Sequence, residues 1–372
     1  MICNRISVGN FRNIENAEVT FTPGVNILLG DNAQGKTSLL EAIYFISLGR
    51  SFRSVHESEL IKFGEEYSRI SLDYSDAVRN QNITIFLSKD KRRHVEQNKV
   101  KITKMSDIIG QFRAVMFCPE HLSLVKDGPS ERRAFLDVAI SQLRPVYLKS
   151  LQKYNQILRQ RNQLIKSAYN DRKSFDDTIE FWSRQLAHEA AVISKFRLWY
   201  TKLADEHVKR LFVRMTGERE VPEIVYVGSS KQAPEEYSDV ALTEEKYFEL
   251  LMSNHDREIA LGATVYGIHK DDIEIMLNGR SARLFASQGQ QRSLAITLKL
   301  AEGEICKTDS GEYPVLLLDD VLSELDGRRR AFLQNEINSR QVIMTTCERE
   351  NISRSPNVNI INVTAGEYRK NQ

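Results

Sequence analysis

Apolar residues along this chain follow two different spacings, and each spacing predicts a different kind of element. Short uninterrupted apolar runs at 25–29, 114–117 and 315–318 predict buried strands. From about residue 130 to Met215, apolar positions instead recur every three or four residues, and glycine and proline nearly vanish. That spacing predicts amphipathic helices. We therefore expect an α/β protein with a helical insertion.

The most regular helical pattern runs from Phe175 to Leu211, with Glu189 as its one charged interruption. A shorter series from Tyr147 to Leu158 precedes it, and a polar turn at 170–174 separates the two. Such heptad-like spacing predicts an antiparallel, coiled-coil-like helical hairpin. The pattern fits a projecting arm and equally fits a helical subdomain packed on the globular body.

Composition narrows the class of protein without naming a function. With 372 residues and 41% hydrophobic content, the chain is globular and long enough for two or three domains. A net charge of +2 makes no overall case for nucleic acid, so any basic surface must come from local clustering. Scattered cysteines and the lack of a long apolar run predict a cytoplasmic protein outside the membrane.

The segment GDNAQGKT, residues 30–37, fits the phosphate-binding P-loop pattern G-x-x-x-x-G-K-[ST]. A predicted strand at 25–29 precedes it and a predicted helix at 38–48 follows, a setting that favours a P-loop over a plain glycine-rich turn. Lys36 would reach the β- and γ-phosphates, and the Thr37 hydroxyl would bind Mg²⁺. The predicted ATP-binding residues are Gly30, Asp31, Asn32, Ala33, Gln34, Gly35, Lys36, Thr37 and Ser38.

The apolar run Val315 to Leu318 ends in two acids, Asp319 and Asp320, as the Walker B strand of such a site does. We assign Asp319 to Mg²⁺, and Asp320 to orienting or deprotonating the attacking water. A strand that simply ends in a polar turn is the alternative. Paired with the P-loop, the two acids predict an ATPase that uses ATP and Mg²⁺, with Lys36 and Asp320 as catalytic residues.

A second candidate anion site lies between these two motifs. Ser287, Gln288, Gly289 and Gln290 precede an apolar helical run, and a helix N-terminus attracts anions. One nucleotide does not need two such sites, which suggests that Ser287 and Gly289 serve the γ-phosphate held by a second copy of the chain. Ser287 as an ordinary N-cap of its own helix remains the alternative.

Together these motifs resemble the ABC-type ATPase heads of the SMC family and, within that group, the RecF family. The matching segments are GDNAQGKTS at 30–38, GPSERRAFLD at 128–137, SQGQQRS at 287–293 and LLLDDVLSELD at 316–326. The resemblance implies an ABC-type P-loop ATPase head carrying a helical insertion. It also implies head pieces at 1–125 and 261–372 around a mainly helical domain at 126–260.

The resemblance further implies an ATP-dependent homodimer that binds DNA, either double-stranded or at a single/double-strand junction. Such proteins act with RecR and RecO to help load RecA at gaps, and their weak, DNA-stimulated ATP hydrolysis resets the complex without chemistry on DNA. By motif match, Ser287, Gln288, Gly289 and Gln290 are the signature that acts in trans, and Asp326 lies at the dimer seam.

A basic stretch from Lys89 to Lys104 predicts a polar hairpin. It is either a lysine-protected sheet edge or a surface that contacts phosphates. If the protein binds DNA, these and two further arginines become the candidate contacts. The candidates are Lys91, Arg92, Arg93, Lys99, Lys101, Arg132 and Arg133.

Some residues depart from the family pattern. Residues 267–272 read GIHKDD where the family usually has GPHRDD, and no role is assigned to them. The switch histidine of transporter ATPases is absent, with Thr346 or Cys347 in its place. No Q-loop is clearly recognisable, and Glu120 is the candidate for its position over the nucleotide. Two other functions remain as alternatives. One is a transporter's nucleotide-binding subunit. The other is an ATP-dependent nuclease, which would need an acidic metal-binding domain that we do not expect in this chain.

Overall fold

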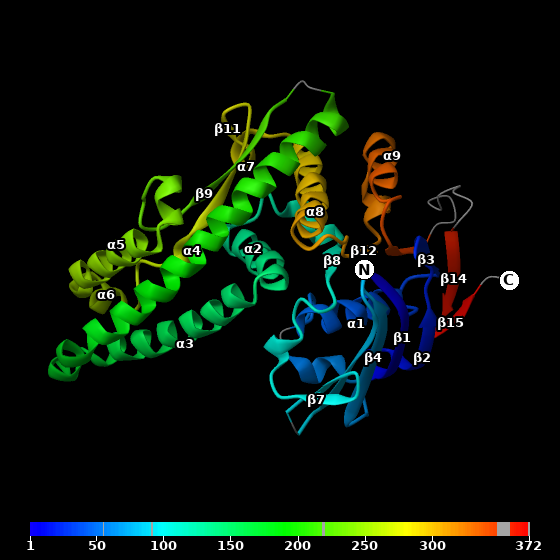
Figure 1. Ribbon diagram of the computed structural model, residues 1–372, viewed down its shortest axis with the longest axis horizontal. Helices are drawn as coiled ribbons and strands as arrows, with labels where there is room; N and C mark the ends of the chain where they lie inside the picture. Colours follow the sequence, from blue (N-terminus) through cyan, green and yellow to red (C-terminus); the bar gives the residue numbers. More distant parts are fainter. Residues whose placement is uncertain (55, 91, 218–219, 348–357, 371–372) are drawn as a thin grey trace. The chain divides into compact units, whose positions relative to one another are not determined.

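The computed structural model describes residues 1–54, 56–90, 92–217, 220–347 and 358–370 (Figure 1). The chain divides into two compact units. The head unit comprises Met1–Ser123 and Ala295–Gln372, and the helical unit comprises Leu124–Leu294. The predicted boundary at 260/261 differs from this division, because residues 261–294 belong to the helical unit.

The head unit contains an antiparallel sheet of six strands in the order β2-β1-β4-β5-β6-β7. Its strands are β1 (Ile2–Phe11), β2 (Ile14–Thr20), β4 (Tyr67–Ser75), β5 (Asn80–Ser88), β6 (His94–Gln97) and β7 (Val100–Ile102). One face packs on the core and the other is polar, so apolar and polar residues alternate along β2, for example.

The second sheet of the head unit has the order β15-β14-β3-β13-β12-β8, and all its strands except β15 run parallel. Its strands are β3 (Val25–Leu29), β8 (Ala114–Phe117), β12 (Val315–Asp319), β13 (Val342–Thr346), β14 (Val358–Thr364) and β15 (Glu367–Lys370). Every residue of β3, β8, β12 and β13 is buried, and the first three confirm the strands predicted from apolar runs.

Helix α1 (Lys36–Leu48) contacts strands of both sheets and is buried along nearly its whole length. A helix that is apolar on all sides suits such a position. It ends at Gly49, whose φ of 64° is left-handed, as predicted for a glycine C-cap. The other head helix is α9 (Gly327–Glu336), and α8 (Gln288–Ser310) contains the point at which the two units divide.

The helical unit consists of helices around a three-stranded sheet of order β11-β10-β9. Its helices are α2 (Pro129–Leu143), α3 (Pro145–Ser167), α4 (Arg172–Thr216), α5 (Val240–Ser253), α6 (His255–Leu261) and α7 (Ala282–Phe285). Its strands are β9 (Pro222–Val227), β10 (Asp272–Leu277) and β11 (Arg280–Ser281). Among the described residues, no helix has the length and apolar character needed to cross a membrane.

The predicted helical hairpin is formed by α3 and α4, which run side by side (Figure 1). Along α4, Phe175, Leu186 and Tyr200 are fully buried, as the apolar stripe predicts. Helix α4 also packs against α5 and β9. The stripe therefore forms the core of the helical unit.

Residues 261–294 belong to the helical unit because β10 pairs with β9 along its whole length. The buried Asp271 adds polar contacts: it accepts a hydrogen bond of 2.8 Å from the Ser229 amide, and the Arg197 guanidinium lies 3.4 Å away. Arg197 also donates to the Ile268 carbonyl at 2.7 Å. The segment 267–272, to which no role was assigned from the sequence, thus joins β9, β10 and α4.

Candidate ATP-binding site

The loop between β3 and α1 has the backbone conformation of a phosphate cradle. A Cβ atom on Gly30 would lie 2.2 Å from the Val363 carbonyl oxygen, so only glycine fits there. Ala33 and Gly35 have left-handed φ values of 64° and 108°. Alternation of this kind turns successive amides toward one side of the loop, and a concave anion site results.

The Lys36 ammonium folds back over this loop. It donates to the carbonyl oxygens of Gly30 and Asp31, the latter at 2.7 Å, and lies 3.3 Å from the Cys347 sulfur. Cys347 in turn donates to the Asn32 side-chain oxygen at 3.0 Å. The predicted phosphate-binding lysine is thus held at the loop by contacts with residues that follow the parallel strands β3 and β13.

The two halves of the predicted magnesium site meet directly. The Thr37 hydroxyl donates to Asp319 Oδ1 at 2.8 Å, and the Thr345 hydroxyl donates to the same oxygen at 2.8 Å. Burial raises the pKa of the Asp319 carboxyl, and the two hydroxyl hydrogen bonds oppose that rise. Thr345 was not predicted, although its strand neighbours β12 and pairs Asp319 with it.

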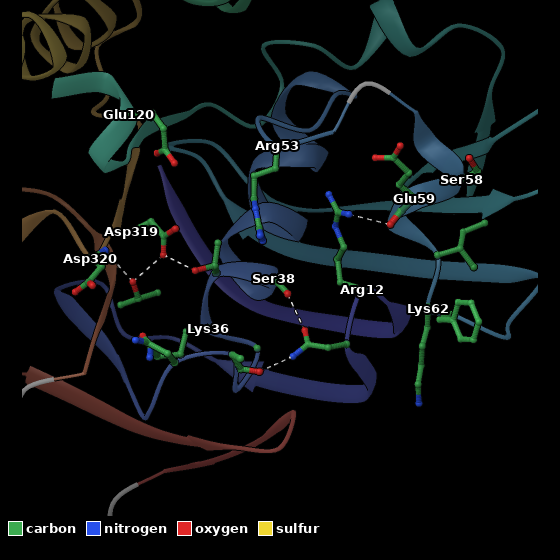
Figure 2. A pocket seen from close by; sticks show the side chains of 18 of the residues that line it. Arg12, Lys36, Ser38, Arg53, Ser58, Glu59, Lys62, Glu120, Asp319 and Asp320 are labelled. Carbon is green, nitrogen blue, oxygen red and sulfur yellow. Dashed lines mark hydrogen bonds between the residues drawn. The ribbon is translucent and has the colours of Figure 1, made fainter. Parts of the chain in front are cut away.

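Asp320 follows in a conformation unusual for a residue other than glycine. Its φ is 50°, in the left-handed region, and its amide donates to the Thr345 hydroxyl at 2.9 Å. Backbone strain of this kind persists where surrounding contacts hold it, and it is common at active sites. The turn gives Asp319 and Asp320 separate positions on the site (Figure 2).

These groups line a cavity of about 1250 Å³ in the head unit. Lys36, Asp319 and Asp320 lie at one side of it, and Arg12, Glu59 and Lys62 lie at the other (Figure 2). Its size suits a nucleotide better than a single anion, since ligand pockets commonly measure hundreds of Å³. Glu120, the candidate for the Q-loop position, also lines the cavity.

Arg12 is a cavity residue that the sequence did not single out. It forms two hydrogen bonds with the fully buried Glu41, at 2.9 and 2.7 Å, and donates to the Glu59 carbonyl at 2.9 Å. A buried carboxylate requires such a partner. Arg12 thereby joins α1 to the short 3-10 helix η1 (Glu57–Leu60), which lies on the far side of the cavity.

The predicted signature lies at the start of α8. Ser287 Oγ accepts from the Gln290 amide at 3.3 Å, and Gln290 Oε1 accepts from the Ser287 amide at 2.7 Å. This is a capping box, so the N-cap alternative describes the geometry within the chain. Ser287 and Gln288 are exposed.

Asp326, predicted at the dimer seam, is the N-cap of α9. Its Oδ1 accepts from the Arg329 amide at 3.0 Å, and this hydrogen bond lowers the pKa of the Asp326 carboxyl. The side chain is 51% exposed, so it remains accessible at the head surface.

The basic stretch forms the predicted hairpin at the edge of the first sheet. Strands β6 and β7 are joined by Asn98 and Lys99, both with left-handed φ, as a tight hairpin turn requires. Arg92, Lys99 and Lys101 are exposed. Arg93 is partly buried, with its guanidinium 2.6 Å from both Glu57 and the Gly49 carbonyl. Lys91 lies outside the described residues.

Arg132 requires a correction as a candidate DNA contact. It is 5% exposed, and its guanidinium forms two hydrogen bonds with the Asp272 carboxylate. Its charge is therefore neutralised inside the helical unit. The sequence shows two adjacent arginines, but it does not show that one of them pairs with Asp272. Arg133 is less buried and donates to the Asp271 carbonyl at 2.8 Å.

The family model described as "RecF/RecN/SMC N terminal domain" matches residues 2–371. Curated relatives include "DNA replication and repair protein RecF" of Alkaliphilus oremlandii, 38% identical over 95% of both chains. The protein of the same description from Ruminiclostridium cellulolyticum is 38% identical over 98% of both chains.

Solved structures give a matching result. The chain aligns with the structure described as "the recombination mediator protein RecF-ATPrS in RecFOR pathway" at a TM-score of 0.93 and 34% identity. That alignment covers 100% of this chain and 98% of the other. An Smc head bound to a winged-helix domain of ScpA aligns at a TM-score of 0.57 and 14% identity, a similarity of fold alone.

Proposed function

Because this chain belongs to the RecF family of DNA replication and repair proteins, we propose that it is an ATP-dependent DNA-binding ATPase of recombinational repair. Bound ATP joins two copies of the chain head to head, and the joined pair binds DNA. Slow, DNA-stimulated hydrolysis separates the copies and releases the DNA. Nucleotide state is then a switch for association, since a ligand that binds the joined state more tightly than the separate copies stabilises it.

The contact between Thr37 and Asp319 supports this proposal most directly. The Thr37 hydroxyl at the N-terminus of α1 and the Asp319 carboxylate at the end of β12 lie 2.8 Å apart. Both are hard oxygen ligands of the kind that Mg²⁺ prefers. The residues present therefore fit ATP with Mg²⁺: Thr37 and Asp319 would hold the metal ion, which neutralises phosphate charge when bound.

The remaining steps follow from the chain's own groups. The loop amides and the α1 N-terminus bind the phosphates, and the Lys36 ammonium exchanges its loop carbonyls for phosphate oxygens. Asp320 orients the attacking water or takes its proton. Its separate position beyond the β12 strand end suits that role, because Asp319 is already engaged by two hydroxyl groups.

The signature at Ser287, Gln288, Gly289 and Gln290 serves the γ-phosphate held by the partner copy. In the capping box, the Ser287 hydroxyl acts as an acceptor, and a hydroxyl can donate at the same time. Capping and phosphate binding are therefore compatible. Asp326 lies at the same seam in this proposal.

DNA binding would use exposed basic residues, with Arg92, Lys99 and Lys101 of the β6–β7 hairpin as the main candidates. Phosphate contacts alone recognise the form of DNA and not its sequence. Relatives are described as mediators in the RecFOR pathway, which supports RecR and RecO as partners and RecA loading as the outcome.

The solution mass of an Asp320→Asn variant, which slows hydrolysis, tests the central step. We expect a monomer without nucleotide and with ADP, and a dimer with ATP and Mg²⁺. A DNA-binding assay under the three conditions should follow the dimer. A mass that is indifferent to nucleotide would contradict the proposed switch while leaving the ATP site in place.

A further inference from the structure

We propose that Asn13 and the β14–β15 hairpin are positioning elements for the nucleotide phosphates, because they hold the P-loop carbonyls on one side and so aim the P-loop amides at the other. The inference rests on the proposed ATP site. It adds a set of residues outside the P-loop motif that determine how well the loop binds a diphosphate or triphosphate.

Asn13 lies in the turn between β1 and β2 and bridges the P-loop to α1. Its side-chain amide nitrogen donates to the Ala33 carbonyl at 3.1 Å, and its side-chain oxygen accepts from the Ser38 hydroxyl at 2.7 Å. Ser38 was predicted to contact ATP, but its hydroxyl is directed to Asn13. One exposed side chain thus links both ends of the cradle.

The turn of the β14–β15 hairpin holds the next peptide. Ala365 and Gly366 both have left-handed φ values, 50° and 80°, which makes a tight turn that exposes its amides. The Gly366 amide donates to the Gln34 carbonyl at 3.0 Å, and the Ala365 amide donates to the Gln34 side-chain oxygen at 2.5 Å. Two donors from one turn therefore fix a single P-loop residue.

Tyr368 on β15 holds the third peptide. Its hydroxyl donates to the Gly35 carbonyl at 2.9 Å, and the same carbonyl accepts the Leu39 amide at 3.0 Å at the start of α1. Burial raises the pKa of the Tyr368 hydroxyl, so it stays a donor at all physiological pH values. The hairpin and the helix thus fix this carbonyl together.

These three contacts have a geometric consequence for the amides. In a planar trans peptide, the C=O and the following N–H point in opposite directions. Holding the carbonyls of Ala33, Gln34 and Gly35 on the outer side therefore directs the amides of Gln34, Gly35 and Lys36 inward. Successive amides that converge in this way bind phosphate oxygens, and their fixed orientation avoids an entropic cost on binding.

Two single substitutions test the inference with little risk to folding. Asn13→Ala removes an exposed side chain, and Tyr368→Phe removes only a hydroxyl. Asn16→Ala and Tyr67→Phe are matched controls, since both residues are exposed positions of the first sheet. The affinities for ATP, ADP and adenosine are measured by calorimetry, and the melting temperature is measured without nucleotide.

We expect each test variant to bind ADP and ATP about fivefold more weakly, because the loop amides are no longer held in the orientation that phosphate needs, and the double variant more weakly still. Binding of adenosine, which carries no phosphate, should match the wild type, and the melting temperature should fall by no more than a few degrees. Unchanged ADP affinity in the double variant would overturn the inference, as would equal losses for ADP and adenosine. A wild-type chain that bound neither ATP nor ADP would overturn the ATP site as well.

Discussion

The Arg132 guanidinium and the Asp272 carboxylate form a two-bond ion pair, with Nε–Oδ1 and Nη2–Oδ2 distances of 2.8 and 2.7 Å. Arg132 also donates to the Asp127 carbonyl at 2.6 Å. The pair joins the first turn of α2 to the start of β10, segments that are far apart in sequence. Two motifs that resemble family segments, at 128–137 and 267–272, therefore meet inside the helical unit.

Replacing Arg132 with leucine should lower stability, because it leaves the Asp272 carboxylate partly buried without its partner. The Arg132 and Asp272 side chains are 6% and 23% exposed, so we expect a loss of about 2 to 3 kcal/mol in the free energy of unfolding, below that for a fully buried pair. Urea denaturation measures it. Arg92→Leu, at an exposed site, is the control, and equal stability of the two variants would contradict the structural role.

Replacing Lys36 with methionine should abolish tight ATP binding, because the ammonium is the one side-chain cation that the P-loop itself supplies to the phosphates. ATP-dependent dimerisation should disappear with it. Calorimetry and solution mass measure the two effects separately. A Lys36→Met chain that still dimerised with ATP would show that nucleotide does not bridge the two copies.

Replacing Ser287 with arginine should separate binding from dimerisation. The residue is exposed and lies on the capping turn of α8, so a single copy should keep its ATP affinity. A bulky cation at the seam should block the approach of the partner's P-loop. Ser167→Arg, at an exposed site of the same helical unit and outside the proposed seam, gives the matched control. Loss of ATP binding by the Ser287→Arg monomer would contradict a role in trans.

The parts of the candidate ATP site that are encoded locally could be predicted from the sequence. The P-loop, its flanking strand and helix, and the two acids at the end of β12 depend on residues that are adjacent in the chain. The buried strands were also predictable, since residues buried on both faces form uninterrupted apolar runs. The stripe on α4 was predictable because one buried face of a helix places apolar residues every three or four positions.

The groups that complete the site come from distant segments, and no local pattern marks them. Asn13, Thr345 and Tyr368 reach the site only because the sheets bring together the ends of separate strands. Arg132 illustrates the converse error, since two adjacent arginines look like a basic surface until the pairing of one with Asp272 is known. Basic residues in a sequence can be assigned to a basic surface only when the acidic residues that pair with them in the fold are known.

Stability should fall as pH decreases from about 6.5 to about 4 because of His269. Burial lowers the pKa of His269 to about 4, and its ring contacts the Tyr154 hydroxyl at 2.7 Å and the Thr264 carbonyl at 3.1 Å. Between its ordinary and folded pKa values, the unfolded chain binds more protons, so stability is complete above this range and is lost on acidification. We expect roughly 3 kcal/mol in total from this group.

Urea denaturation at a series of pH values measures this dependence. His269→Gln should make it less steep by the share that His269 contributes, because glutamine has no proton to gain. His56→Gln, at an exposed site, should leave it unchanged. His121, which is partly buried and whose pKa is lowered to about 3 by desolvation, contributes a similar dependence in the head unit. An identical pH profile for wild type and His269→Gln would contradict the assignment.

The β6–β7 hairpin makes a separate prediction about DNA. If Lys99 and Lys101 contact phosphates, replacing both with alanine should reduce the slope of log affinity against log salt by about 1.8, because each lost contact retains one more counterion on the duplex. Affinity at low salt should fall for every DNA sequence alike. Replacing Lys195 and Lys202 on α4, which are also exposed, changes the net charge by the same amount. If both double variants alter the slope equally, the effect is one of total charge, and the two hairpin lysines serve to protect the edge strand β7.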